Sequence, residues 1–268
     1  MAENTTAFAG TIPRNYDTFM GPMLFEPYAI DMAERLKKVI VKNDVLELAC
    51  GTGRVTKHLR SSLPENENLI ATDLNKDMIE IAKQKNISKN IEWRVADAQS
   101  LPFDDESFDA IVCQFGYMFM PDKEKAFAES FRVLKKGGTL LFNCWDSIAD
   151  NDLANAANDV VAGFFPDNRP MFFYIPYSFY DTKLINSFLN KTGFNNIQIE
   201  LVKKESISTS ANAAKGMIEG SPISMFINEH APSSLNKIRD AVEKEIGDKY
   251  GVNPLKAPMQ AWVIEALK

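Results

Sequence analysis

The chain has 268 residues, of which 45% are hydrophobic and 25% are charged, and its formal net charge is −6. This composition is typical of a globular protein of one large or two small domains and excludes disordered and fibrous classes. An acidic chain lacks the basic excess that holds proteins on nucleic acid. No apolar run approaches the roughly 18–20 residues of a membrane helix, and residues 1–15 lack the apolar core of a signal peptide. Three cysteines are too few for a disulfide framework. We therefore expect a cytoplasmic protein with neither a nucleic-acid nor a membrane partner.

Residues 1–40 are expected to form a polar tail followed by one amphipathic helix. The apolar residues of this helix recur at spacings of three and four, from Leu24 and Phe25 to Val39 and Ile40. Pro22 is expected in its first turn, where proline is tolerated.

From Asp44 onward, short apolar runs alternate with stretches of helical periodicity. The expected strands are 44–48, 69–72, 91–95, 108–113 and 139–145, and the expected helices between them are 54–63, 75–85 and 123–135. Asn75 is expected to cap the second of these helices, and Gly137 with Gly138 to turn the chain into the fifth strand. Such alternation predicts parallel strands joined by right-handed crossovers, which is a doubly wound, Rossmann-like α/β sheet.

After Asp146 the pattern is less regular. Helices are expected at 150–164 and 181–192, strands at 197–202 and 259–266, and further helices within 206–256, one of them after Pro232 and Ser233. Gly193 is expected to end the helix before it. We expect a single domain over residues 1–268, which consists of a cofactor-binding core (41–146) and a helical cap. The cap would combine the N-terminal helix (1–40) with two insertions, 147–180 and 205–257.

Three successive strand ends carry residues that suit a nucleoside cofactor. Gly51 and Gly53 follow the first strand, where they permit a tight bend and the close approach of a ligand to free N–H groups. Asp73 ends the second strand, in the position where a carboxylate binds ribose hydroxyls. Asp97 ends the third strand, within reach of an adenine edge. Taken alone, the glycine pair could form a plain tight turn, and each aspartate could cap a helix at the end of a strand. Their combination at three successive strand ends predicts a cofactor site.

The residues around the glycine turn narrow the choice of cofactor. Thr56 is bulkier than the small residue that a nicotinamide site requires, and the chain has no Gly-Lys-Ser/Thr phosphate loop. The segment Glu47-x-Ala49-Cys50-Gly51-Thr52-Gly53 resembles the first motif of the class I S-adenosylmethionine-dependent methyltransferases. Later motifs of that family match Ala71-Thr72-Asp73-Leu74-Asn75, Ala96-Asp97-Ala98, Leu101-Pro102-Phe103, Ser107-Phe108-Asp109 and Val133-Leu134-Lys135-Lys136-Gly137-Gly138. The resemblance covers about residues 40–146 and is closest to the small-molecule branch that includes the ubiquinone/menaquinone-biosynthesis methyltransferases.

The resemblance implies S-adenosyl-L-methionine as cofactor, S-adenosyl-L-homocysteine as product, and a seven-stranded mixed sheet whose last strand is antiparallel. It implies that Ala49, Gly51 and Gly53 line the methionine part of the cofactor, that Glu47 supports the loop, and that Thr52 also belongs to the cofactor site. It implies that Asp73 binds the ribose, and that Leu74, Met78, Asp97 and Ala98 contact the adenine. Gln114 and Phe115 would cover the cofactor on its substrate side. Tyr16 and Phe19 would lie in an N-terminal segment that closes over the site. Lys136 replaces the proline that the family usually has there, which should leave cofactor binding unaffected.

Methyl transfer requires an acceptor atom held in line with the S–CH₃ bond, and it requires that water be excluded. Aromatic rings near a sulfonium stabilise its charge, and Phe115, Tyr117 and Tyr16 are candidates, with core packing as the alternative. His58 is expected to be solvated, whereas His230 is a candidate general base, with a surface histidine as the alternative. His230 and Tyr16 are thus the candidate catalytic residues. Without a Cys-x-x-Cys spacing, we expect no metal site.

Eight aromatic residues fall within residues 164–180. They predict either cap packing or an apolar pocket for the acceptor. We therefore expect methyl transfer to a small hydrophobic or aromatic acceptor, by a monomer or a homodimer. Three alternatives stay open: a binding module that keeps the cofactor without catalysis, a nucleotide-dependent oxidoreductase, and a protein methyltransferase.

Overall fold

The computed structural model describes residues 10–39, 44–88 and 90–268. Their contacts divide the chain into two compact units. The sheet unit comprises residues 28–145, 179–202 and 261–268, and the helical unit comprises the segment up to Pro27, 146–178 and 203–260. The segments expected as a cap fall mainly in the helical unit, except that the N-terminal helix from Tyr28 onward belongs to the sheet unit.

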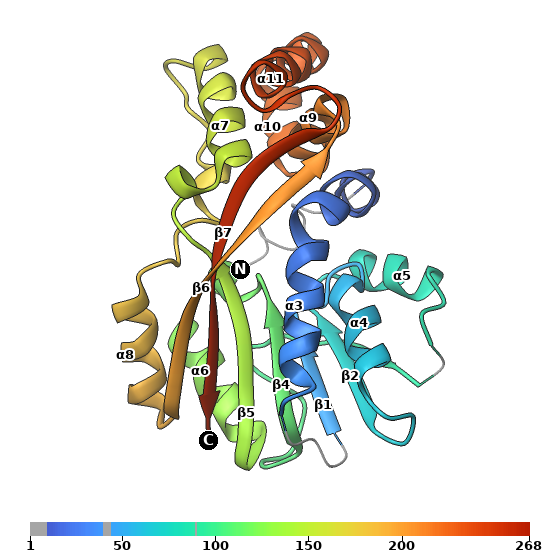
Figure 1. The fold of residues 1–268 in the computed structure, drawn as a ribbon, viewed down its shortest axis with the longest axis vertical. Helices are drawn as coiled ribbons and strands as arrows, with labels where there is room; N and C mark the ends of the chain where they lie inside the picture. Colours follow the sequence, from blue (N-terminus) through green and yellow to red (C-terminus); the bar gives the residue numbers. More distant parts are fainter. Residues whose placement is uncertain (1–9, 40–43, 89) are drawn as a thin grey trace. The chain divides into compact units, whose positions relative to one another are not determined.

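Seven strands form one sheet in the order β3-β2-β1-β4-β5-β7-β6 (Figure 1). They are β1 (Asp44–Leu48), β2 (Asn68–Asp73), β3 (Glu92–Val95), β4 (Phe108–Gln114), β5 (Leu134–Trp145), β6 (Asn195–Ser208) and β7 (Leu255–Leu267). Strands β1 to β5 pair in parallel, whereas β7 is antiparallel to β5. The predicted doubly wound, seven-stranded mixed sheet is therefore confirmed.

Helices flank both faces of the parallel strands, and their ends follow local sequence signals. They are α3 (Glu26–Leu36), α4 (Arg54–Ser62), α5 (Lys76–Gln84), α6 (Lys123–Val133) and α8 (Thr182–Thr192). In Figure 1, α3 and α4 lie in front of the sheet and α6 lies behind it. Asn75 caps α5, because its side chain accepts hydrogen bonds from two main-chain N–H groups of the first turn. Gly193 ends α8 with a φ of 111°. Both cap predictions are confirmed.

The N-terminal helical segment begins earlier than the periodicity predicts. Pro13 lies in the first turn of α2 (Ile12–Asn15), whereas Pro22 lies inside a π-helix, η1 (Tyr16–Phe25). The prediction that Pro22 starts the helix was therefore wrong. In η1 the N–H of Glu26 bonds to the carbonyl of Gly21 five residues back, a pattern that a search for 3.6-residue periodicity does not detect. Ile40, the last residue of the predicted apolar stripe, and the first nine residues of the chain lie outside the described residues.

The two glycines before the fifth strand also differ from expectation. β5 begins at Leu134, so Gly137 and Gly138 lie within it instead of turning the chain into it. Gly137 has a φ of 74°, and a Cβ on Gly138 would lie 2.8 Å from the carbonyl oxygen of Lys135 and 3.0 Å from that of Asp109 in β4. The register of β4 with β5 shifts between Phe108 and Ala110. The glycine pair therefore marks an irregularity inside the strand, where two main chains come close together.

The helical unit contains most of the late insertions. Its longer helices are η1, α7 (Asp152–Phe164), α9 (Ser210–Glu219), α10 (Ile223–His230) and α11 (Leu235–Tyr250). The predicted helices within 206–256, including one after Pro232 and Ser233, are confirmed. α9 packs on η1 through Gly216, where a Cβ would lie 3.1 Å from the Cβ of Phe19.

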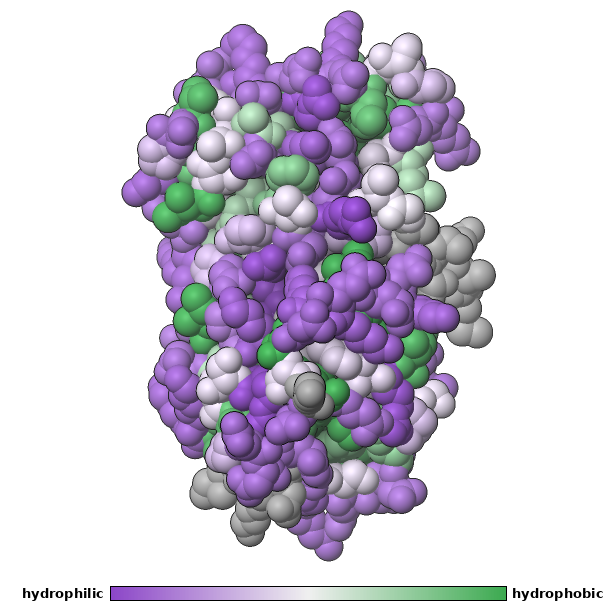
Figure 2. All heavy atoms as spheres, turned by 90° about the vertical axis from the view of Figure 1, so that its right-hand side faces the viewer, coloured by the Kyte–Doolittle hydropathy of each residue, from purple (hydrophilic) through white to green (hydrophobic). Residues whose placement is uncertain are grey.

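The face drawn in Figure 2 is mainly hydrophilic, with small hydrophobic groups scattered over it. Within the described part of the chain, no helix is both long enough and apolar enough to cross a membrane.

Candidate functional site

The turn between β1 and α4 uses main-chain conformations that few residues adopt. Ala49, Gly51 and Gly53 have φ angles of 52°, 53° and 77°. Ala49 therefore holds a left-handed conformation without being a glycine, which costs free energy and is commonest at functional sites. The N–H of Cys50 bonds to the carbonyl of Thr72 at 2.9 Å and ties the turn to β2.

The two glycines of this turn serve different purposes. A Cβ on Gly51 would meet no heavy atom within 4 Å, so its main chain borders open space. A Cβ on Gly53 would lie 3.0 Å from the Cβ of Ala82 and 3.1 Å from the ring of Trp93. Gly51 thus leaves room for a ligand, whereas Gly53 lets α4 pack closely against its neighbours.

These contacts predict separate effects for the two positions. Gly51→Val should weaken ligand binding at least tenfold, because the branched side chain enters the open space, and should also lower the free energy of unfolding by about 1–3 kcal/mol, because a φ of 53° strains a side chain there. Gly53→Ala should lower the free energy of unfolding by about 1–3 kcal/mol through overpacking and its own positive φ, but should leave ligand binding within about threefold. Calorimetric binding and urea unfolding of both variants check this prediction, and equal effects of the two substitutions on binding would contradict it.

Asp73 fastens the glycine turn to the end of β2. Its carboxylate oxygens accept hydrogen bonds from the N–H of Gly51 and the N–H of Asn75, each at 2.8 Å. Burial raises the pKa of Asp73, although these N–H groups oppose the shift. A carboxylate can accept about four hydrogen bonds, so Asp73 keeps acceptor capacity for ligand hydroxyls.

Glu47 places a second carboxyl on the neighbouring strand. It is 1% exposed, and its Oε2 accepts no hydrogen bond from the described residues. Burial, together with the charge of Asp73, raises the pKa of Glu47 to about 8. At neutral pH the Glu47 carboxyl is therefore mostly protonated in the free protein, and it places a buried polar group beside the open turn.

Apolar side chains lie exposed at the ends of β2 and β3. Leu74 is 47% exposed, and Val95, which pairs with Asp73 in the sheet, is 50% exposed. Asp97 accepts hydrogen bonds from the main-chain N–H of Gln99 at 2.8 Å and from its side-chain amide at 3.1 Å. Exposed apolar side chains beside carboxylates suit a planar nucleobase, whose face is apolar and whose edge is polar. Sequence reasoning missed Val95, because only the strand register shows that it lies beside Asp73.

The carboxyl ends of β4 and β5 carry an aromatic cluster. The ring of Phe115 stacks on that of Trp145, with centroids 3.9 Å apart and planes 9° apart. Tyr28 of α3 packs edge-on against both rings, and its hydroxyl donates to the carbonyl of Val202 at 3.1 Å. Phe115 has a φ of 52°. Of the three rings only Phe115 was predicted, because the contacts of the other two depend on the tertiary fold.

The other predicted cofactor residues lie near this edge or in the adjoining core. Thr52 and Met78 are buried, whereas Ala98 and Gln114 are half-buried. Tyr117 stacks on Phe127 and its hydroxyl bonds to that of Ser130 at 2.7 Å, so it belongs to the core. For Tyr117 the structure favours the alternative of core packing.

The two candidate catalytic residues lie in the helical unit. Tyr16 stacks on Phe25 with ring centroids 4.9 Å apart. His230 is exposed, stacks on Phe226 of its own helix at 4.1 Å, and its Nδ1 lies 2.9 Å from the Phe226 carbonyl oxygen. This arrangement resembles the surface-histidine alternative, and both catalytic assignments stay predictions.

The exposure of His230 leads to a direct test. His230→Ala should retain turnover within about threefold, because the ring contacts its own helix and is not held in a buried pocket. Initial rates with saturating cofactor check this expectation. A loss of 100-fold or more, of the size that general bases contribute, would restore His230 as the base.

The aromatic residues of the segment 164–180 also divide between the units. Phe165 packs edge-on against Phe226, at a centroid distance of 5.1 Å, within the helical unit. Phe179 belongs to the sheet unit and packs on Phe127 at 6.4 Å. Most of the others are at least half-buried, so packing accounts for much of the cluster.

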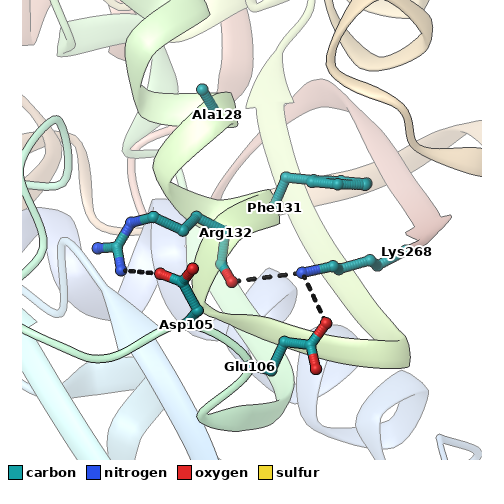
Figure 3. A pocket seen from close by; sticks show the side chains of 6 residues that line it. All are labelled: Asp105, Glu106, Ala128, Phe131, Arg132 and Lys268. Atoms are coloured by element: carbon teal, nitrogen blue, oxygen red, sulfur yellow. Dashed lines mark hydrogen bonds and ion pairs between the residues drawn. The ribbon is translucent and has the colours of Figure 1, made fainter.

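A hollow of about 420 Å³ lies near the amino ends of β4 and β5, at the edge of the sheet opposite to the glycine turn (Figure 3). Its Arg132 is paired with Asp105 at 2.8 Å and with Glu129 at 2.8 Å. Lys268 donates to the carbonyl of Arg132 at 3.3 Å and lies 3.9 Å from Glu106 (Figure 3). The acidic and basic side chains of this hollow are thus paired with one another, whereas the open turn at Gly51, the strained Ala49 and Phe115, and the carboxyls of Glu47 and Asp73 lie at the carboxyl edge. We therefore place the functional site at the carboxyl edge.

Part of the chain is similar in sequence to known proteins. Residues 46–142 match the model of a family described as a methyltransferase domain. Over 137 residues the chain is 36% identical to the ubiquinone/menaquinone biosynthesis C-methyltransferase UbiE of Francisella tularensis subsp. novicida, covering 49% of this chain and 55% of that protein. UbiE of Cronobacter sakazakii is 41% identical over 101 residues, which cover 36% of this chain and 40% of that protein. The chain thus spans about half the length of the curated relatives it matches.

Solved structures extend the likeness to nearly the whole chain. Phosphoethanolamine N-methyltransferase 2 of Haemonchus contortus, in complex with S-adenosyl-L-methionine, has a TM-score of 0.62 at 16% identity and covers 99% of this chain and 58% of that one. The YcgJ protein of Bacillus subtilis has a TM-score of 0.59 at 18% identity, covering 90% and 98%. At such identities the likeness shows the fold alone.

Residues 46–142 therefore match a methyltransferase domain, and they lie in a sheet of mixed α/β type. Within that class, this core resembles the ubiquinone/menaquinone biosynthesis C-methyltransferases. Both points confirm the resemblance found in the sequence motifs.

Proposed function

We propose that this protein transfers a methyl group from S-adenosyl-L-methionine to a small hydrophobic or aromatic organic molecule. The observation that carries the proposal is the open glycine turn at Gly51, held by Asp73 and flanked by the buried carboxyl of Glu47. These residues fit the cofactor: the turn leaves room for it, the Asp73 carboxyl can accept hydrogen bonds from its ribose hydroxyls, and the Glu47 carboxyl offers an oxygen acceptor beside the turn. When bound, S-adenosyl-L-methionine supplies a methyl group that its sulfonium activates for displacement.

The residues of the carboxyl edge would divide the binding between them. The Gly51 turn and Glu47 would hold the amino-acid part, and Asp73 would accept hydrogen bonds from the ribose. Leu74 and Asp97 would contact the face and edge of the adenine. Because such groups are fixed before binding, they orient the reactive methyl group at little further cost in entropy.

The proposed acceptor follows from the apolar character of the substrate side. Phe115 and Trp145 present stacked rings at the ends of β4 and β5, and rings of this kind exclude water and favour an apolar or aromatic partner. The curated relatives act, by their names, in ubiquinone and menaquinone biosynthesis, which agrees with an acceptor of this class. We further propose that the protein is cytoplasmic and works as a monomer or a homodimer, without nucleic acid or a membrane as partner.

A second candidate is a protein that binds the cofactor without methyl transfer. One structural neighbour, SpnF, is titled a [4+2]-cyclase and has a TM-score of 0.54 at 19% identity, covering 91% of this chain and 81% of that one. A shared fold therefore does not determine the chemistry. A protein methyltransferase is a further alternative, which acceptor screening would also detect.

Calorimetry and product analysis test the proposal together. We expect S-adenosyl-L-methionine to bind with a Kd of about 1–100 µM, and S-adenosyl-L-homocysteine to form with at least one acceptor among phenols, catechols, quinols and short amines. Binding without product across this panel and across protein substrates would favour the binding module. Failure to bind S-adenosyl-L-methionine, with binding of NAD(P) instead, would overturn the proposal.

A further inference from the structure

One residue, Asn143, holds the main chain of Phe115 with two of its oxygens. Asn143 is fully buried in β5. Its side-chain Oδ1 accepts a hydrogen bond from the N–H of Phe115 at 2.9 Å, and its carbonyl oxygen lies 3.2 Å from the same nitrogen. The end of β4 is thus attached to β5 at the point where the strand hydrogen bonding stops.

Phe115 adopts a conformation that requires such support. Its φ of 52° lies in the left-handed region, which bulky side chains rarely occupy unless the surroundings enforce it. In this conformation its ring stacks on Trp145, and Tyr28 packs against both. The hydrogen bonds that Asn143 accepts from the N–H of Phe115 therefore fix the position of the two stacked rings.

The segment after Phe115 connects this support to the glycine turn. A Cβ on Gly116 would lie 2.5 Å from the Sγ of Cys113 and 2.7 Å from the Cβ of Ala49. Only a glycine fits so close to Ala49, the residue that opens the turn between β1 and α4. A shift of Phe115 and Gly116 would consequently press on the turn.

Core packing alone does not explain an asparagine at this position. The Nδ2 of Asn143 is buried and has no hydrogen-bond partner among the described residues. Burying a donor without a partner costs free energy, and leucine, which has nearly the same size, would not incur that cost. The hydrogen bond that Oδ1 accepts from the N–H of Phe115 instead explains why this residue is an amide.

We propose that Asn143 is a positioning residue, which holds Phe115 and its stacked partner Trp145 in place for the ligand at the carboxyl ends of β4 and β5. The ligand in question is S-adenosyl-L-methionine, so this inference rests on the proposed function. Asn143 acts through Phe115 and is not itself assigned a contact with the ligand.

Two substitutions separate positioning from a structural role. Asn143→Leu removes the side-chain acceptor and leaves only the longer contact, at 3.2 Å, with the main-chain carbonyl of residue 143. It should raise the Kd of S-adenosyl-L-methionine at least tenfold, while the melting temperature of the free protein stays the same or rises. Asn143→Asp, measured at pH 6, keeps an accepting oxygen and should remain within about threefold of the wild-type Kd. Asn190→Leu, on the exposed side of α8, is the matched control and should change neither quantity.

A measurement on the free protein makes the test independent of the ligand. Hydrogen exchange of the Phe115 amide, followed by NMR, should become at least tenfold faster in Asn143→Leu and should change little in Asn143→Asp. The near-UV circular dichroism of the stacked rings should change in the leucine variant only.

The outcomes distinguish this inference from the proposed function. If the wild type binds S-adenosyl-L-methionine and Asn143→Leu binds it equally well, the positioning role is wrong and the proposed function stands. Unchanged exchange at Phe115, or a melting temperature that falls by more than about 10 °C in Asn143→Leu, would also overturn the positioning role. If the wild type does not bind the cofactor, the proposed function fails, while the exchange data still decide whether Asn143 holds Phe115.

Discussion

Replacement of Asp73 by alanine is expected to weaken the binding of S-adenosyl-L-methionine by about 100-fold or more. In the free protein this carboxylate already holds the N–H of Gly51 at 2.8 Å, so the substitution loosens the turn as well as removing the acceptor for the ribose. Hydrogen bonds to charged groups contribute about 1.5–3 kcal/mol each. Two such bonds to ribose hydroxyls thus correspond to at least about 3 kcal/mol, or roughly 100-fold in Kd. Isothermal titration calorimetry at constant pH measures the change.

Two further variants make this prediction specific. Asp73→Asn keeps one accepting oxygen and should lose less affinity than Asp73→Ala. Asp77→Asn, an exposed position in the first turn of α5, is the control and should bind the cofactor as the wild type does. A Kd within threefold of wild type for Asp73→Ala would show that β2 does not carry the ribose contact.

The second large effect is a change in the free energy of unfolding with pH, which we expect Glu47 to cause. The pKa of Glu47 is raised to about 8 in the folded protein, chiefly by burial, against an ordinary value of 4.5. A group whose folded pKa is raised contributes stability that is complete below about pH 4.5 and is lost as the pH rises through 8. Each pKa unit corresponds to about 1.4 kcal/mol, so the loss by pH 9 is on the order of 4 kcal/mol.

Glutamine at position 47 is expected to remove this pH dependence. Urea unfolding of wild type and Glu47→Gln between pH 4.5 and 9 measures the difference in the free energy of unfolding. We expect the free energy of unfolding of the variant to rise relative to that of the wild type by about 4 kcal/mol over this range. Glu80→Gln, an exposed residue on α5, serves as control. If the free energies of unfolding of wild type and Glu47→Gln differ by the same amount at every pH, the raised pKa of Glu47 is wrong.

Much of the sheet unit could be predicted because its signals are local. Short apolar runs predicted β1 to β4 within one or two residues, and Asn75 and Gly193 marked helix ends through their own capping chemistry. The site residues on β1 and β2 could also be predicted, since Gly51 and Asp73 directly follow or end buried strands.

The remaining features depend on contacts between distant parts of the chain. A search for helical periodicity does not detect the π-helix η1. The glycines of β5 resemble a turn in the sequence, because no local signal shows how closely the neighbouring main chain approaches. Tyr28, Asn143 and Trp145 gain their roles only when α3, β4 and β5 lie together. None of the three stands in a motif that a single sequence displays.

A crystal structure of the protein grown with excess S-adenosyl-L-homocysteine would test the central claim most directly. The account predicts electron density for the ligand along the ends of β1, β2 and β3, with its ribose hydroxyls on the carboxylate of Asp73 and its amino-acid part over Gly51. An empty carboxyl edge, or a ligand bound elsewhere while Asp73 contacts no sugar, would contradict it.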